Sequence, residues 1–322
     1  MKNEKPRILE FFAGIGGAAE AFGALGQVVA AIDINQNARQ VYRSVFPHPY
    51  LVKSIESLTL DDLLKWQADV WWISAPCQPF TRRGKQRDDV DPRSLALKRL
   101  CELIPLATKQ SQPRIVFFEN VAGFDGSQMH GLFLNALKQS HFSTYQYTTC
   151  PTRFGIPNQR PRLYLAASRS PSAPWLIPDA QTQTQTQTQT QTQTQTQTLA
   201  SYLDSTEQAS LNQGLWLTAE HSNMQSRLNI VHREDRYSTC FTSAYGKSSM
   251  LSGSYLREVN GRIRRFSPAE IARLLGFSEG FVKRFRPETT ELTQRQLWKL
   301  VGNSISITVV KALIRHHMEE LN

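Results

Sequence analysis

The chain has 322 residues, of which 40% are hydrophobic, and it carries a formal net charge of +10. This length and composition fit a globular protein with a full core, and the basic excess is consistent with a polyanionic partner. The four cysteines are far apart and form no CxxC pair, which excludes a zinc cage or a small disulfide scaffold and fits a reducing cytoplasm.

An almost uncharged stretch, residues 11–32, has the composition of a membrane segment. Glu20 and several glycines interrupt it, and the turn-forming AGIGG divides it into a buried strand and a helix. We therefore expect no association with a membrane.

The first 169 residues alternate short apolar runs with amphipathic segments, a pattern typical of a parallel α/β sheet. The runs RILEFF, QVVAAI, DVWWIS and RIVFFE predict strands at residues 7–12, 27–32, 69–74 and 114–119. Between them, helices are predicted at residues 35–46, 59–66 and 92–106.

The composition changes at residue 170 and leads to nine QT dipeptides at residues 181–198. An uncharged polar repeat cannot form a packed core, so we expect an extended insert without a chemical role. Residues 199 to about 262 have weak periodicity, which predicts a small irregular domain.

Two helices are predicted near the chain's end. SPAEIARLLGF begins with a cap at Ser267 and has Glu270 at the capping-box position, and SISITVVKALIRHHMEEL is predicted to close the chain. The expected domains are a catalytic and cofactor-binding domain, a QT linker, a small target-recognition domain, and a segment returning to the first domain, at residues 1–169, 170–198, 199–291 and 292–322.

Two features of the first strands suggest an adenosine-containing cofactor. AGIGG follows the first strand, at the edge of the sheet where such folds bind ligands, and Asp33 ends the second strand, where a carboxylate can bind a ribose diol. The glycines lack the G-x-G-x-x-G spacing, which disfavours a nicotinamide dehydrogenase.

The next two strands place candidate catalytic groups at the same edge. Cys77 lies just past one strand on a Pro-flanked loop, and Glu119 is expected just past another. A partly buried Glu119 would have a raised pKa and could carry a proton. A thiol nucleophile, an acid, an adenosine cofactor and a basic surface together indicate methylation of a base carbon.

Five motifs, FAGIGG, PCQPF, ENV, NQRPR and GNS, stand in the order and spacing of the cytosine-5 methyltransferase family. The chain resembles that family over residues 7–169 and about 262–315. The resemblance implies a Rossmann-like, S-adenosylmethionine-dependent α/β fold with a smaller target-recognition domain. It also implies methylation of cytosine C5 through a covalent adduct between Cys77 and C6.

The chain also resembles one particular branch of this family. The motifs SIESLTLDDL, PCQPFTRRGKQRDDVDPRS, ENVAGF and CFT are similar to the branch that methylates the anticodon loop of aspartate tRNA, although Ala75 replaces a proline and the QT tract has no counterpart. This similarity favours tRNA over DNA as the partner. The alternatives are a DNA cytosine-5 methyltransferase of a restriction-modification system and a catalytically silent nucleic-acid-binding module, which the intact Cys77, Glu119 and Arg162 disfavour.

The resemblance also assigns individual residues. Cys77 would attack C6, Glu119 would protonate or hydrogen-bond N3, and Arg160 and Arg162 would hold the base. The expected cofactor-binding residues are Phe12, Ala13, Gly14, Gly16, Gly17, Asp33, Ile34, Ser54, Ile55, Ser74, Asn303 and Ser304. The expected substrate-binding residues are Arg82, Arg83, Lys85, Cys240, Phe241 and Thr242.

Two basic segments are expected to contact phosphates. Residues 82–99 carry seven basic and three acidic side chains, and residues 257–286 carry eight and three. The first would lie beside the target base and the second would hold the tRNA stem. We expect no metal site, a cytoplasmic location and a monomer.

Overall fold

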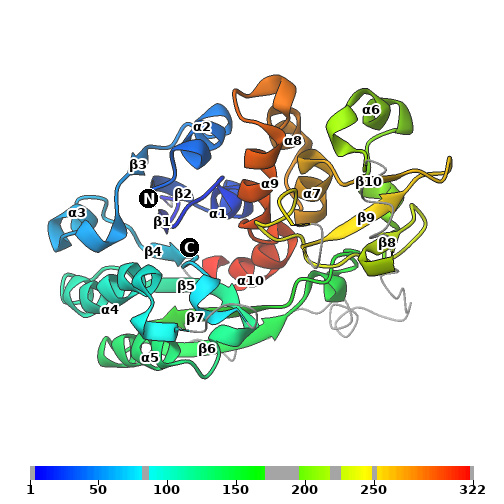
Figure 1. The fold of residues 1–322 in the computed structure, drawn as a ribbon. Helices are drawn as coiled ribbons and strands as arrows, with labels where there is room; N and C mark the ends of the chain where they lie inside the picture. The colour runs from blue at the N-terminus through cyan, green and yellow to red at the C-terminus, as the bar shows by residue number, and fades with distance from the viewer. Residues whose placement is uncertain (1–3, 82–86, 171–195, 218–225, 249–251, 320–322) are drawn as a thin grey trace, which may run out of the picture. The chain divides into compact units, whose positions relative to one another are not determined.

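The structure is a computed structural model and describes residues 4–81, 87–170, 196–217, 226–248 and 252–319 (Figure 1). The chain forms two compact units. The first comprises Met1–Thr149, Pro161–Ile177 and Lys311–Asn322, and the second comprises Cys150–Arg160 and Pro178–Val310. The domain boundaries expected from the sequence are assigned by function. They stay a prediction, because the two units are defined by their internal packing alone.

A seven-stranded sheet with the order β3-β2-β1-β4-β5-β7-β6 forms the centre of the first unit. Its strands are β1 (Arg7–Phe11), β2 (Gln27–Asp33), β3 (Tyr50–Val52), β4 (Val70–Ile73), β5 (Ile115–Val121), β6 (Ser143–Thr149) and β7 (Arg162–Ser168). The first five strands are parallel, and β7 runs antiparallel to β5 and β6. The strand order reverses between β1 and β4, the position at which such sheets bind ligands.

The four strands predicted from apolar runs are present, and the predicted Rossmann-like fold class is confirmed. The sheet is mixed rather than wholly parallel, because β7 returns between β5 and β6. The polar strand β6, STYQYTT, gave no apolar signal, since it lies at the edge of the sheet with most of its residues at least partly exposed.

Four helices of the first unit form where the sequence predicts them: α1 (Gly17–Phe22), α2 (Gln36–Val45), α3 (Leu60–Leu64) and α4 (Leu95–Thr108). A fifth, α5 (Gln128–Gln139), was not predicted. The side chain of Asn35 caps α2, and a capping box of Thr59 and Asp62 begins α3. Helices α4 and α5 pack together (Figure 1) and share one hydrophobic core with the sheet.

Alternation along the strands builds a core on each face of the sheet. Leu9 and Phe11 of β1 belong to the cluster that includes the buried residues of α4 and α5. On the other face, the rings of Phe22, Trp72 and Phe117 all contact one another, with ring centroids 6.1–6.2 Å apart. His317 of α10 (Ile307–Glu319) contacts Phe117 at 5.7 Å, so the chain's last helix belongs to this core.

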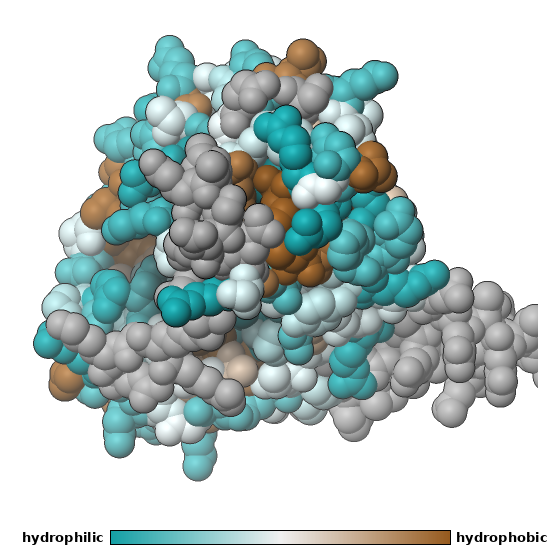
Figure 2. Space-filling model, turned by 45° about the vertical axis from the view of Figure 1, so that its right-hand side comes forward, coloured by the Kyte–Doolittle hydropathy of each residue, from teal (hydrophilic) through white to brown (hydrophobic). Residues whose placement is uncertain are grey.

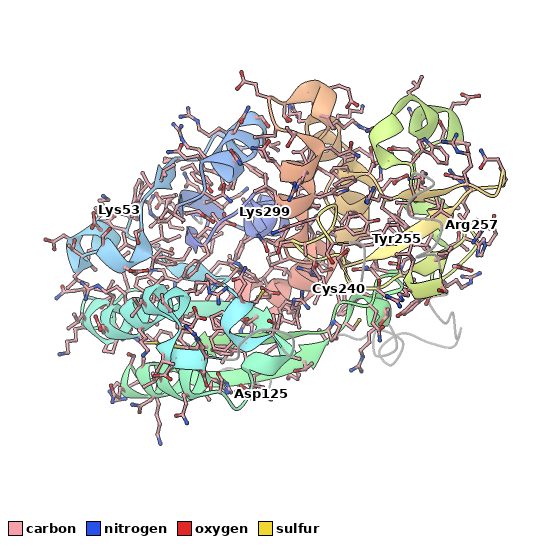
Figure 3. All side chains as sticks on the ribbon, in the orientation of Figure 1. Lys53, Asp125, Cys240, Tyr255, Arg257 and Lys299 are labelled. Carbon is pink, nitrogen blue, oxygen red and sulfur yellow. The ribbon has the colours of Figure 1, made fainter. Side chains whose placement is uncertain are left out.

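In the described part of the second unit, a three-stranded sheet is accompanied by short helices. Its strands are β8 (Asn229–Val231), β9 (Ser254–Arg257) and β10 (Ile263–Arg265), and its helices are α6 (Thr206–Leu211), α7 (Pro268–Leu275), α8 (Glu279–Arg284) and α9 (Gln294–Gly302). The predicted capping box of Ser267 and Glu270 begins α7. Tyr255 of β9 is buried, and Arg257 at the end of the strand is partly exposed (Figure 3).

Buried ion pairs connect the elements of the second unit. Arg264 is fully buried between Glu258 and Glu270, with nitrogen–oxygen distances of 2.8 Å to each. Asp204 forms ion pairs with two arginines: its Oδ1 lies 3.0 Å from Nη1 of Arg273 and 2.8 Å from Nη2 of Arg286. Three of the eight basic residues at 257–286 therefore take part in ion pairs within the unit, and one of them, Arg264, is fully buried.

One stretch of the described chain, Gln294–Arg315, is long and apolar enough for a membrane span by length and composition. Residues 303–306 interrupt the helix between α9 and α10, and 67% of the apolar window is buried. Both properties are those of packed core helices.

Candidate active site

Cys77 lies on the loop that leaves the carboxyl end of β4. The residue is half-buried and precedes a short 3-10 helix, η3 (Gln78–Phe80), whose Phe80 amide donates to the Cys77 carbonyl at 3.0 Å. The prediction that this cysteine lies just past a strand is confirmed. Its backbone is fixed by the turn, so the thiol stands at the edge of the sheet.

Glu119 lies inside β5 and not past its end, which corrects the expectation from the sequence. The strand continues to Val121 because the antiparallel strand β7 pairs with it, opposing Glu119 to Tyr164 and Val121 to Arg162. The Glu119 side chain is 9% exposed, and its Oε1 lies 3.4 Å from Nε of Arg162. The ladder thus places a carboxylate and a guanidinium of neighbouring strands side by side.

Asn120 joins the segment of Cys77 to the segment of Glu119. Its side-chain amide is 1% exposed and donates to the carbonyl of Ala75 at 3.2 Å, while its oxygen accepts from the Val121 amide at 2.8 Å. The backbone of Gly123 also lies close to the Cys77 loop: a Cβ on Gly123 would lie 2.4 Å from the carbonyl oxygen of Phe80. Two contacts therefore lock the PCQPF and ENV motifs together.

Cys77 differs from Cys101, the other cysteine of the first unit. Burial raises the pKa of the Cys101 thiol in α4 to about 12, so this thiol stays neutral and unreactive. Cys77 lies instead close enough to Arg93 for an electrostatic interaction. Hydrogen bonds from Arg93 to Asp91, at 2.8 and 2.7 Å, hold this guanidinium and lower the pKa of Asp91 to about 2.

The glycine loop after β1 is held by the tip of β2. The Gly14 amide donates to Asp33 Oδ2 at 2.8 Å, and the Gly14 carbonyl accepts from the Tyr50 hydroxyl at 3.2 Å. Gly14 and Gly16 have φ values of 52° and 88°, and a Cβ on Gly16 would lie 2.4 Å from the Phe46 ring. Only glycine fits this loop at residue 16.

Other predicted cofactor-binding residues have contacts of their own. Ile34 follows Asp33 and exposes 70% of its surface, an uncommon position for a large apolar side chain. The hydroxyl of Ser74 accepts from the Trp72 indole at 2.7 Å, and Ser54 precedes the short helix in which Ile55 is buried.

The strand tips fit the group that the resemblance implies, an adenosine with a methionine tail. An exposed apolar side chain at Ile34 suits a flat purine, and the partly buried carboxylate of Asp33 suits hydroxyl groups. Burial raises the pKa of Asp33, while hydrogen bonds from the amides of Gly14 and Asn35 act in the opposite direction.

An open hollow of about 450 Å³ lies beside the edge strand β3. Ile32, Leu51 and Leu58 form apolar walls, and the cationic side chains at its rim are Arg39, Lys53 and Lys65. Lys53, labelled in Figure 3, is paired with Asp62 at 2.7 Å.

The remaining predicted residues belong to the second unit or lie outside the described residues. Arg160, Phe241 and Ser304 are buried in the second unit, while Cys240, Thr242 and Asn303 are at least partly exposed there. Arg82, Arg83 and Lys85 are not among the described residues. Within the described ranges, no group of three or more acidic, histidine or cysteine side chains could hold a metal ion.

Sequence reasoning missed the residues that connect motifs. Asn120 and Gly123 stand within ENVAGF, yet their contacts reach back to residues 75 and 80, and Arg93 is fixed by an acid two positions before it. Only the position of Asn120 next to Glu119 offered a signal.

Comparison with known proteins gives a consistent result. The family model described as C-5 cytosine-specific DNA methylase matches residues 6–319. A relative from Spodoptera frugiperda named tRNA (cytosine(38)-C(5))-methyltransferase is 28% identical over 96% of this chain and 98% of its own. A Dictyostelium discoideum relative named DNA (cytosine-5)-methyltransferase is also 28% identical, over 97% and 94%. The crystal structure of S. pombe Dnmt2 methyltransferase superimposes with a TM-score of 0.85 at 27% identity, covering 99% of this chain and 100% of that one.

Proposed function

This chain belongs to the C-5 cytosine-specific DNA methylase family, and from that premise we propose that it methylates C5 of a cytosine in the anticodon loop of tRNA. The observation that carries the proposal is the locked pair of motifs in the first unit. Asn120 and Gly123 hold the Cys77 loop against the strand of Glu119, whose carboxylate pairs with Arg162.

Each of these side chains has a distinct task. C5 of cytosine is a weak nucleophile, and addition of the Cys77 thiolate to C6 gives the ring enamine character at C5. Negative charge that develops on the ring at N3 needs a proton or a hydrogen bond there, which Glu119 supplies in its neutral carboxylic-acid form. Arg162 orients the Glu119 carboxylate and presents further N–H groups to the base. After C5 is methylated, loss of the C5 proton to a base breaks the bond between C6 and sulfur and releases the thiolate.

The proposed cofactor is S-adenosylmethionine, which when bound supplies a methyl group made electrophilic by its sulfonium sulfur. Asp33 and Ile34 would hold its adenosine, and the backbone of Phe12, Ala13 and Gly14 would hold its amino-acid end. Gly16 keeps that loop open, since a side chain there would meet Phe46.

Two features support RNA over DNA as substrate. The relative from Spodoptera frugiperda has a tRNA-specific name, and the CFT triplet at residues 240–242 is similar to the tRNA-modifying branch. An anticodon loop also presents unstacked bases, whereas extraction of a base from a duplex costs a few kcal/mol. The equal identity to the Dictyostelium relative makes a DNA substrate the second candidate.

The decisive experiment compares methyl transfer to total tRNA and to genomic DNA, followed by bisulfite sequencing of both. We expect modification of one loop cytosine in tRNA and none in DNA. Methylation of DNA at a fixed short motif, with unmodified tRNA, would overturn the tRNA assignment.

A trapping experiment tests the nucleophile separately. RNA containing 5-fluorocytosine should form a stable complex with the protein and cofactor, because fluorine cannot leave C5 as a proton does. Cys77→Ala should abolish the complex, and the matched control Cys101→Ala should retain it. A complex that persists in Cys77→Ala would assign the nucleophile to another residue.

A further inference from the structure

The CFT and GNS motifs meet at one buried guanidinium within the second unit. Arg160 is 3% exposed. Its Nη1 donates to Cys240 Sγ at 3.2 Å and to the Phe241 carbonyl at 3.1 Å. Its Nη2 donates to the carbonyls of Gly302 and Ser304. The two terminal nitrogens of the planar Arg160 guanidinium therefore bind two different segments. Cys240 in one segment and Gly302 in the other are 62 residues apart in the chain.

The partners of this guanidinium are unusual for a buried charge. Among the described residues they are three carbonyl oxygens and a thiol, with no carboxylate. A buried cation without a counter-ion depends strongly on each acceptor around it. The Cys240 thiol also donates to the Phe241 carbonyl at 3.7 Å, so the sulfur has a fixed orientation when it accepts from Arg160.

Direct packing joins the same two motifs. A Cβ on Gly302 would lie 2.3 Å from the carbonyl carbon of Thr242 and 2.5 Å from the amide nitrogen of Ser243. The end of α9 thus rests on the backbone of the CFT triplet. A displacement of that backbone would be transmitted directly to the Gly302–Ser304 turn.

Phe241 has no surface to offer to a substrate. The side chain is 3% exposed, and its ring packs against Tyr245 at 5.1 Å and Phe266 at 5.0 Å. The middle residue of the triplet is therefore part of the core of the second unit, which argues against base stacking by this ring. Figure 3 shows Cys240, which begins the triplet.

We propose that Cys240 is a positioning residue for the cofactor-binding turn: its thiol fixes the Arg160 guanidinium, which in turn fixes the carbonyls of Gly302 and Ser304. The CFT triplet then acts on Asn303 and Ser304 instead of reading RNA. This rests on the proposed function in one respect, the cofactor S-adenosylmethionine, and on the family resemblance, which implies that Asn303 and Ser304 bind it.

The test measures cofactor and RNA affinity separately in the full chain. S-adenosylhomocysteine is titrated by calorimetry without RNA, and tRNA is titrated by filter binding without cofactor. Cys240→Ala should weaken S-adenosylhomocysteine binding about tenfold, equal to about 1.4 kcal/mol, and change tRNA affinity less than about twofold. Cys240→Ser should retain most of the affinity, because a hydroxyl oxygen also accepts from Nη1.

A double-mutant cycle identifies Arg160 as the intermediary. Once Arg160→Met has removed the guanidinium, Cys240→Ala should have little further effect, either on S-adenosylhomocysteine binding or on the free energy of unfolding in urea. Lys247→Ala, an exposed residue of the same segment, is the matched control and should leave both unchanged.

Two results would overturn the inference: a loss of tRNA affinity in Cys240→Ala at unchanged S-adenosylhomocysteine affinity, or full additivity of the two substitutions in urea. Failure of the proposed function is distinguishable. An enzyme that methylates DNA and not tRNA would still show both the cofactor effect and the non-additivity.

Discussion

Glu10 is a carboxylic acid within the apolar strand β1, and it is 1% exposed. Burial raises its pKa to about 8, although the amides of Ala18 and Ala19 and the Tyr42 hydroxyl at 3.4 Å act in the opposite direction. The charge of Asp33 raises the pKa further. Glu10 is therefore mainly protonated in the folded protein at neutral pH.

This raised pKa predicts a pH-dependent stability. Glu10 ionises near its ordinary pKa of 4.5 in the unfolded chain and near 8 in the fold, so between these values the folded state binds the extra proton. The contribution to stability is fully present below the unfolded pKa and is lost as pH rises through the folded pKa, by about 1.4 kcal/mol for each pH unit between the two. Glu10→Gln cannot ionise, so it should gain stability relative to the wild type as pH rises from about 4.5 to about 8.

Urea unfolding at several pH values measures this difference. The exposed residue Glu56 provides the matched control, Glu56→Gln, which should follow the wild-type curve. Parallel pH curves for Glu10→Gln and the wild type would contradict the prediction and show that Glu10 stays ionised in the fold.

At the scale of elements, Asp88 connects its own segment to the helix α5. Its carboxylate accepts from the amides of Gln128 and Met129, the first residues of α5, at 2.7 and 3.0 Å. The residue has a φ of 51°, and its carbonyl accepts from the Ser94 hydroxyl at 2.6 Å. A charge and two acceptors at a helix N-terminus stabilise its first turn.

Asp88→Ala should lower the free energy of unfolding by about 1–2 kcal/mol, because it removes two hydrogen bonds to the first turn of α5 and places an alanine at positive φ. Asp88→Asn should cost less, since an amide oxygen still accepts and asparagine tolerates this conformation. Thermal or urea unfolding checks both. Asp89→Ala, which breaks only the partly exposed pair with Lys98 at 3.0 Å, is the control and should cost under about 1 kcal/mol. Equal losses in all three variants would contradict a capping role.

The limit of sequence-based prediction is visible at this scale. The apolar runs predicted β1, β2, β4 and β5, and with them the places of Asp33 and Cys77, because strand ends are local features. Glu119 was placed wrongly, because the end of β5 is set by pairing with β7, which lies later in the chain.

The residues that join motifs were beyond the reach of local patterns. The bond from Asn120 to Ala75 spans 45 positions, the one from Gln128 to Asp88 spans 40, and the one from Arg160 to Ser304 spans 144. Such contacts depend on tertiary packing, which a single sequence does not display.

For the whole molecule, the basic residues include two classes: arginines that form ion pairs inside a unit, and side chains that are exposed at the surface. Of the eight basic residues at 257–286, Arg264, Arg273 and Arg286 take part in ion pairs within the second unit. Lys283 and Arg284 on α8 are exposed. The face drawn in Figure 2 is mostly hydrophilic, with a few hydrophobic patches between. Net charge along the sequence therefore overstates the surface available to RNA.

The two classes should respond differently to substitution. Lys283→Ala combined with Arg284→Ala should weaken binding of many RNAs alike and reduce the salt slope by about one unit per lost phosphate contact, without loss of stability. Arg264→Ala should instead destabilise the fold by about 3–5 kcal/mol, because two carboxylates remain buried without their partner. Filter binding across salt concentrations and urea unfolding distinguish them. An unchanged salt slope in the double variant would place the RNA elsewhere.

The contact between Gly302 and the Thr242 backbone has a consequence for protein engineering. Suppose that residues 199–291 are replaced by the corresponding segment of a relative. The backbone at residue 242 and the side chain at residue 240 then come from the relative, while their partners Gly302 and Arg160 come from this protein. Crossover points at 149/150, 160/161, 177/178 and 310/311 keep each of these partners with its own ancestor. Chimaeras joined at these points take the CFT and GNS motifs from the same parent protein. Chimaeras joined at the ends of residues 199–291 take the two motifs from different parents.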